Sequence, residues 1–138
     1  MKVDNNSNES DPAVTQEKVI VINFNDKAID KLFVTSGNRI TVKFNNIKVS
    51  YLTGLVLRYS PLTKKKKFYL RYKYKGKSFW LKLNEFILGH YGTLDVSEEL
   101  LGLHKKYYKD GHWQHDPSEQ LITQRQRLLL ISFQQNQL

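Results

Sequence analysis

Apolar and polar residues alternate along four segments of the chain, which is the pattern of half-buried β-strands. These segments span residues 39–44, 55–59, 67–75 and 77–83, and a β-branched run at residues 19–24 predicts one more strand. Residues 27–33 place apolar side chains on one helical side, with Asn25 or Asp26 available as the N-cap. Strands and helices in this order predict an α+β fold.

A tight turn at Lys75 and Gly76 is predicted to join the two longest alternating segments. A shift of the pairing by one residue would bury lysine and arginine, so the alternation specifies the register. The expected sheet therefore has one apolar and one cationic face. The expected cross-strand pairs are Tyr72–Phe79, Leu70–Leu81 and Phe68–Leu83 on the first face, and Lys73–Ser78, Arg71–Trp80 and Tyr69–Lys82 on the second.

Residues 94–109 predict a helix that covers the apolar face. Asp95 or Ser97 is the expected cap, and Gly111 is expected to end the helix before a loop at residues 112–117. The predicted architecture is a three-stranded antiparallel sheet packed against a C-terminal helix, with an extra N-terminal strand and helix and a helical tail. The stripe expected to face the sheet consists of Val96, Leu100, Leu103 and Tyr107.

One domain is expected in this chain of 138 residues. Residues 1–18 are polar and without periodicity, which predicts a disordered leader. The domain follows at residues 19–117, and residues 118–138 form a Gln-rich, helix-prone tail. In this tail the run 128–131 is apolar on every side of the expected helix, which predicts that it is buried against a partner.

Basic residues outnumber acidic ones by 22 to 13, which gives a net charge of +9. Ten basic residues and no acidic one lie between Arg58 and Lys82. Such a segment repels itself unless a polyanion neutralises it, and on a surface it is the electrostatic footprint of a protein that binds a phosphate backbone. The alternative interpretation is a lysine-rich surface that serves solubility.

The basic residues of this segment are interleaved with aromatic ones in strand order, and a two- or three-stranded ribbon of this kind fits the major groove of B-DNA. Arg71 is the expected base-edge contact, because a guanidinium can donate two hydrogen bonds to guanine. A basic loop is expected at residues 63–66, and the lysines at 64–67 are expected to clamp phosphates. Tyr69 and Trp80 are expected to pack on sugars or orient the cations. The candidate DNA-binding residues are Arg58, Lys64, Lys65, Lys66, Lys67, Tyr69, Arg71, Lys73, Lys75, Lys77, Trp80 and Lys82.

Catalysis and cofactor binding find little support in the sequence. There is no cysteine, no G-x-S-x-G motif and no glycine-rich phosphate loop. The four histidines, of which His112 and His115 flank Trp113, are weak metal candidates without cysteine ligands. No apolar run reaches about 18 residues, and the N-terminus lacks a secretory signal, so a soluble intracellular protein without membrane partners is expected.

The order of motifs resembles the N-terminal arm-type DNA-binding domain of phage and genomic-island integrases of the tyrosine recombinase family. In that family a strand of the form GL-hydrophobic-R precedes an RY-x-x-x-GK hairpin and an LG-x-[YF] strand end, and a helix and a short G-x-DP loop follow. The matching segments here are GLVLR at residues 54–58, RYKYKGK at 71–77, LNEF at 83–86 with Asn84 where glycine is usual, the helix at 97–108, GHWQHDP at 111–117 and, upstream, FNDKAIDKL at 24–32.

The resemblance implies a three-stranded sheet packed on a helix that binds double-stranded DNA at arm-type sites during DNA integration. It also implies other integrase protomers or accessory factors as partners, and a place in the cytoplasm at the bacterial nucleoid. No histidine is followed three residues on by arginine, so the H-x-x-R motif of the catalytic domain is missing, and neither enzyme activity nor a cofactor is expected.

Two other classes of function remain open. An RNA- or single-strand-binding β domain would use Trp80 and Tyr69 to stack on bases and would act as a regulatory factor. A protein-interaction module would use the apolar tail as its contact surface.

Overall fold

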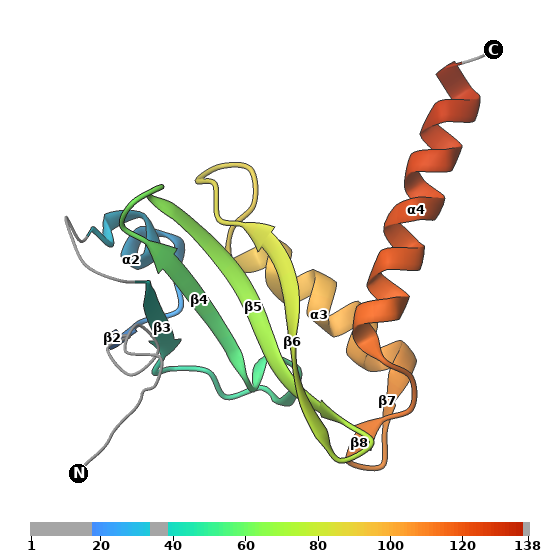
Figure 1. The fold of residues 1–138 in the computed structure, drawn as a ribbon, viewed down its shortest axis with the longest axis horizontal. Helices are drawn as coiled ribbons and strands as arrows, with labels where there is room; N and C mark the ends of the chain where they lie inside the picture. The colour runs from blue at the N-terminus through green and yellow to red at the C-terminus, as the bar shows by residue number, and fades with distance from the viewer. Residues whose placement is uncertain (1–17, 34–38, 137–138) are drawn as a thin grey trace, which may run out of the picture.

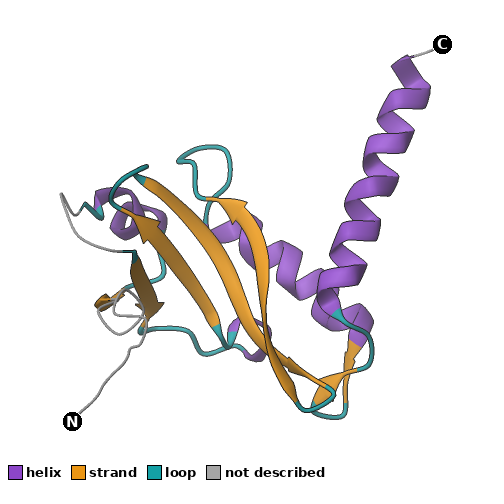
Figure 2. Ribbon diagram, in the orientation of Figure 1, coloured by secondary structure: helices purple, strands orange, loops and turns teal. Residues whose placement is uncertain are grey.

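The computed structural model describes residues 18–33 and 39–136 of the chain. Its sheet lies in front of α3, and α4 leads away from the sheet toward the C-terminus (Figure 1). The α+β class is confirmed, with strands and helices distributed as Figure 2 shows. The elements, in chain order, are β2 (Lys18–Ile22), α2 (Asp26–Lys31), β3 (Ile40–Phe44), the 3-10 helix η1 (Ser50–Leu52), β4 (Leu55–Ser60), β5 (Lys65–Tyr74), β6 (Lys77–Glu85), α3 (Thr93–Tyr107), β7 (Tyr108–Lys109), β8 (His112–Trp113) and α4 (Pro117–Asn136).

The sheet has five strands in the order β2-β3-β4-β5-β6, and not the three that the sequence predicted. β2 pairs in parallel with β3, whereas all the later neighbours are antiparallel. A parallel pair needs a crossover connection, and α2 provides it. The predicted cap is confirmed, because the side chain of Asn25 accepts a hydrogen bond from the Ala28 N–H at 2.7 Å. The N-terminal strand is therefore part of the sheet.

The register of the β5–β6 hairpin is the predicted one at five of the six expected pairs. The sixth, Phe68–Leu83, falls where the ladder shifts between Lys67 and Tyr69, although both side chains are buried. Lys75 and Gly76 form the turn with φ values of 52° and 78°. The prediction of a loop at residues 63–66 is wrong in part, because β5 begins at Lys65. Lys65 and Lys66 therefore lie on a strand, where neighbouring side chains point to opposite faces.

One hydrophobic core lies between the sheet and the helices. The predicted stripe is confirmed, since Val96, Leu100 and Leu103 are buried and Tyr107 packs against them. The predicted cap of this helix is wrong: Gly92 is the N-cap, and its N–H donates to the carboxylate of Asp95 at 2.8 Å. The other core residues come mainly from the inner face of the sheet and from α2: Ile29, Ile40, Val42, Leu55, Leu57, Tyr59, Phe68, Leu70, Tyr72, Leu81 and Leu83.

A small hairpin follows α3 where the sequence predicted the helix to continue and a loop to follow. The helix ends at Tyr107, and β7 pairs with β8 through Tyr108–Trp113 and Lys109–His112. Gly111 does not cap the helix; it forms the hairpin turn together with Asp110, and both residues have positive φ. Type I′ geometry favours this kind of dipeptide.

The first turns of α4 hold it to the domain. Tyr72 donates a hydrogen bond to Asp116 at 2.7 Å, and the same carboxylate accepts from the N–H of Ser118. Burial and this carboxylate raise the pKa of Tyr72 above its usual range. Leu121 is buried, and Arg125 forms an ion pair with Glu99. Among the helices in the described residues, none has both the length and the apolar character needed to cross a bilayer.

Candidate nucleic-acid interface

The outer face of the sheet, opposite α2 and α3, gathers most of the predicted DNA-binding residues. The pairing aligns them in cross-strand rows. One row runs from Lys43 through Val56 and Tyr69 to Lys82, and a second joins Thr41, Arg58 and Lys67. We call the following set the basic face: Lys43, Arg58, Lys65, Lys67, Tyr69, Arg71, Lys73, Trp80 and Lys82.

No acidic residue occurs in β3, β4, β5 or β6 before Glu85, which is the last residue of β6 and pairs with Lys67. The sequence from Lys31 to Asn84 contains 14 basic residues and no aspartate or glutamate. Lysines of the face such as Lys43, Lys73 and Lys82 are exposed. Their positive potential is therefore available to a polyanion.

Two arginines and two aromatic rings form the centre of the basic face. The guanidinium of Arg58 lies 5.1 Å from the ring centroid of Trp80 and 5.9 Å from that of Tyr69. The guanidinium of Arg71 lies 5.2 Å from the Trp80 centroid. The two rings meet edge to face at 5.9 Å. Cation–π contacts of this kind restrict the guanidinium groups, so the rings hold the arginines in place.

Three predicted residues lie at the ends of the hairpins. Lys64 has a φ of 63° in the turn between β4 and β5, and its ammonium lies 4.6 Å from the ring of Phe33. Lys75 lies in the turn between β5 and β6. Lys77 pairs with Tyr74, so by alternation it points to the face opposite the Lys73–Ser78 pair. These three cations extend the positive charge beyond the basic face.

Lys66 is a predicted residue whose ammonium is bound on the inner side of the sheet. It pairs with Tyr59, whose side chain is in the core, and its ammonium donates to the carbonyl oxygens of Ile29 at 2.8 Å and Asp30 at 3.1 Å. Burial lowers the pKa of Lys66, and the Asp30 charge opposes that effect. Lys66 therefore caps the C-terminal end of α2 and is not part of the basic face.

Sequence reasoning missed Lys43 and Arg39 as site residues. Lys43 is an exposed member of β3 on the outer face. Arg39 lines a shallow hollow together with Arg58, Lys65 and Lys67. The alternation of residues 39–44 already puts both cations opposite the apolar side chains. The missing information was that this strand lies beside β4 in the same sheet.

Two of the four histidines pack against aromatic rings. His104 stacks on Tyr108 at 4.1 Å, and His115 meets Tyr107 edge to face. Within the described ranges, no three or more His, Asp or Glu side chains come together as a metal site would require.

Comparisons with protein-family models, with curated proteins and with solved structures find no match to this chain. The residues and geometry above are therefore the basis on which function is proposed.

Proposed function

We propose that the protein binds double-stranded DNA through the basic face, with the β5–β6 hairpin in the major groove. The observation that carries the proposal is that Arg58, Arg71 and Lys82 emerge from the same side of a sheet whose reverse is the hydrophobic core. A two-stranded ribbon such as the β5–β6 hairpin fits the major groove, which is roughly 12 Å wide. The cations would neutralise phosphates on both sides of the groove.

The position of Trp80 favours duplex DNA over single strands. Its side chain is 43% exposed, but two guanidinium groups already lie about 5 Å from its ring centroid. A base that stacked on Trp80 would have to displace them, whereas a duplex can use the same guanidinium groups as hydrogen-bond donors. Arg71, the more exposed of the two arginines, is the proposed base-edge reader.

The likeness to integrase arm-binding domains adds to this proposal. Its motifs fall on β4 and on the β5–β6 hairpin, which supply most of the basic face. We therefore propose arm-type sites as the DNA target and DNA integration as the process, with no catalytic role for this chain.

Charge reversal at the hairpin tests the proposal. A Lys73→Glu/Lys75→Glu variant should bind a mixed-sequence duplex about 100-fold more weakly at 50 mM salt, because two phosphate contacts become repulsive. Fluorescence anisotropy with a labelled duplex measures the affinity. A Lys27→Glu/Lys109→Glu variant is the matched control, since it changes the net charge equally at exposed positions outside the basic face.

Equal duplex binding by the hairpin variant and the wild type would contradict the proposal. The alternative function predicts a different competition result. A protein that reads single strands or RNA would release labelled duplex more readily to an unlabelled single strand or a structured RNA than to unlabelled duplex at the same salt.

A further inference from the structure

A hollow opens where the β5–β6 hairpin leaves the rest of the sheet. β4 begins at Leu55, which pairs with Leu70, while β5 continues to Tyr74. The N–H of Arg71 still donates to the carbonyl oxygen of Gly54 at 2.9 Å. Beyond this bond, no strand in the described part of the chain pairs with β5 on the β4 side. A space of about 510 Å³ lies there between the hairpin, the end of β3 and the segment before β4.

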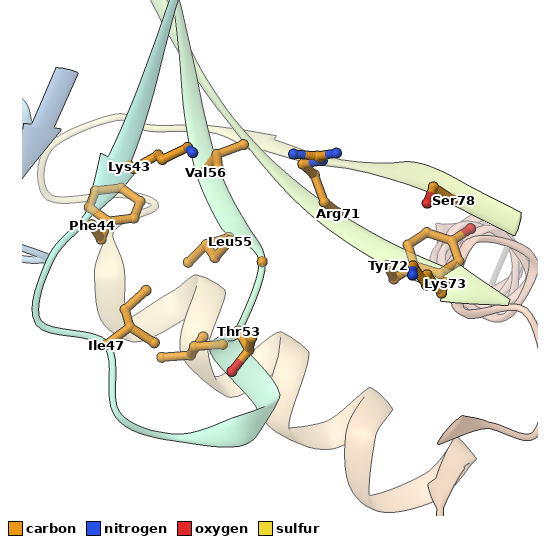
Figure 3. Close-up of a pocket in the computed structure, with 12 residues that line it drawn as sticks. Lys43, Phe44, Ile47, Thr53, Leu55, Val56, Arg71, Tyr72, Lys73 and Ser78 are labelled. Atoms are coloured by element: carbon orange, nitrogen blue, oxygen red, sulfur yellow. The ribbon is translucent and has the colours of Figure 1, made fainter. Parts of the chain in front are cut away.

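The hollow has an apolar wall and a cationic rim. Figure 3 shows Phe44, Ile47 and Leu55 on one side and the hairpin residues Tyr72, Lys73 and Ser78 on the other. The ammonium of Lys43 and the guanidinium of Arg71 lie along one margin of the space (Figure 3). The hydroxyl-bearing side chains of Thr53 and Ser78 line it as well.

This combination matches an anion that has a flat, largely apolar body. The volume is within the range of small-molecule sites, and such sites typically combine an apolar lining with a few polar groups that orient the ligand. The cations of the rim, Lys43, Arg71 and Lys73, belong to the basic face. A nucleotide fits this chemistry, because its base can enter the apolar space while its phosphate stays at the rim.

A base within an intact duplex cannot enter the hollow, since it is stacked on both sides and paired. An unpaired base can leave the stack at a much lower cost. Two guanidinium groups already lie about 5 Å from the Trp80 ring centroid, whereas the hollow beside the hairpin offers a base an apolar wall next to the cations of the basic face.

We propose that the hollow binds a single nucleotide, either as an unpaired nucleotide of DNA held on the basic face or as a free nucleotide. The DNA-bound case rests on the proposed function. In that case the protein prefers duplexes that contain an extrahelical nucleotide, for example at a bulge, over fully paired ones.

The test compares two duplexes of the same sequence, one with a single unpaired 2-aminopurine and one in which that base is paired. Wild-type protein should bind the bulged duplex about tenfold more tightly. Protein binding should reduce the access of a soluble quencher to 2-aminopurine in the bulged duplex and leave it unchanged in the paired one. Thr53→Trp should abolish the preference and leave binding of the paired duplex unchanged, because Thr53 is exposed, lines the hollow and lies outside the basic face. Retained binding of the paired duplex also shows that the variant is folded.

Free 2-aminopurine nucleoside monophosphate is the second arm of the test. If it binds wild type but not Thr53→Trp, and the bulge gives no preference, the hollow is a site for free nucleotide. Equal affinity for both duplexes together with no binding of the free nucleotide overturns the inference while the proposed function stands. Loss of binding to both duplexes and to the nucleotide overturns both.

Discussion

Gly54 shows how one residue determines the start of β4 beside β5. Its φ is +93°, and an added Cβ would lie 2.4 Å from the carbonyl oxygen of Arg71. A side chain at this position would force apart the two strands that flank the hollow.

The substitution Gly54→Ala should lower the free energy of unfolding by about 2 kcal/mol or more, because positive φ and the backbone collision both disfavour alanine. Gly102→Ala is the contrasting control. Gly102 lies inside α3 with nothing within 4 Å of an added Cβ, so alanine should raise the free energy of unfolding by about 0.5–1 kcal/mol. Urea denaturation measures both changes. Equal effects of the two substitutions would contradict this account of Gly54.

Neighbouring lysines show how far sequence patterns determine a side chain's role. Lys67 lies within the alternating segment, so the pattern placed it on the cationic face, where the structure has it. Lys66 was assigned to a loop, and a loop assignment does not predict to which face of the sheet a side chain points. Its contact with the carbonyl groups of α2 joins residues far apart in the sequence. No local pattern records a contact of this kind.

At the scale of elements, alternation predicted the strands and their faces, and the Lys75–Gly76 turn predicted the hairpin register. The partner of β2 could not be predicted this way, since pairing with β3 depends on a crossover and on contacts distant in sequence. The strands β7 and β8 have two residues each, too few for a period to be visible. The hollow could not be predicted from the sequence either, because it results from the different lengths of β4 and β5.

The β7–β8 hairpin gives the protein a pH-dependent element through His104. This ring stacks on Tyr108 at 4.1 Å and meets Trp113 edge to face at 5.8 Å. Desolvation lowers the pKa of His104 below its usual 6.5. The folded state therefore favours the neutral imidazole. Its contribution is fully present above pH 6.5 and is lost as the pH falls from there through the pKa of the folded state.

Replacing His104 with phenylalanine should remove this part of the pH dependence, because the ring stacking remains and the titration does not. We expect the free energy of unfolding, measured in urea at pH 7.5 and pH 5, to fall more for the wild type than for His104→Phe. The other histidines, His90, His112 and His115, are present in both proteins, so their effects cancel in the comparison. An equal fall in the free energy of unfolding of the two proteins would show that His104 does not cause the pH dependence.

For the whole molecule, charge is distributed unevenly along the sequence. The segment from Lys31 to Asn84, which supplies β3, β4, β5 and nearly all of β6, has a net charge of +14. The rest of the chain has 8 basic and 13 acidic residues, a net charge of −5. A polyanion is therefore attracted mainly to the sheet strands that this segment supplies, which orients the molecule before contact.

This uneven distribution makes the salt dependence of DNA binding a quantitative test of the basic face. Contact of about six of its cations with phosphates predicts a slope of about −5 when the logarithm of the association constant is plotted against that of the salt concentration. Lys73→Gln/Lys82→Gln should make the slope shallower by about 2, whereas Lys27→Gln/Lys109→Gln, outside the face, should leave it unchanged. Anisotropy titrations of a labelled duplex between 50 and 200 mM salt provide both values. If the two pairs of substitutions change the slope equally, the net charge of the protein, and not the arrangement of cations on the sheet, governs binding.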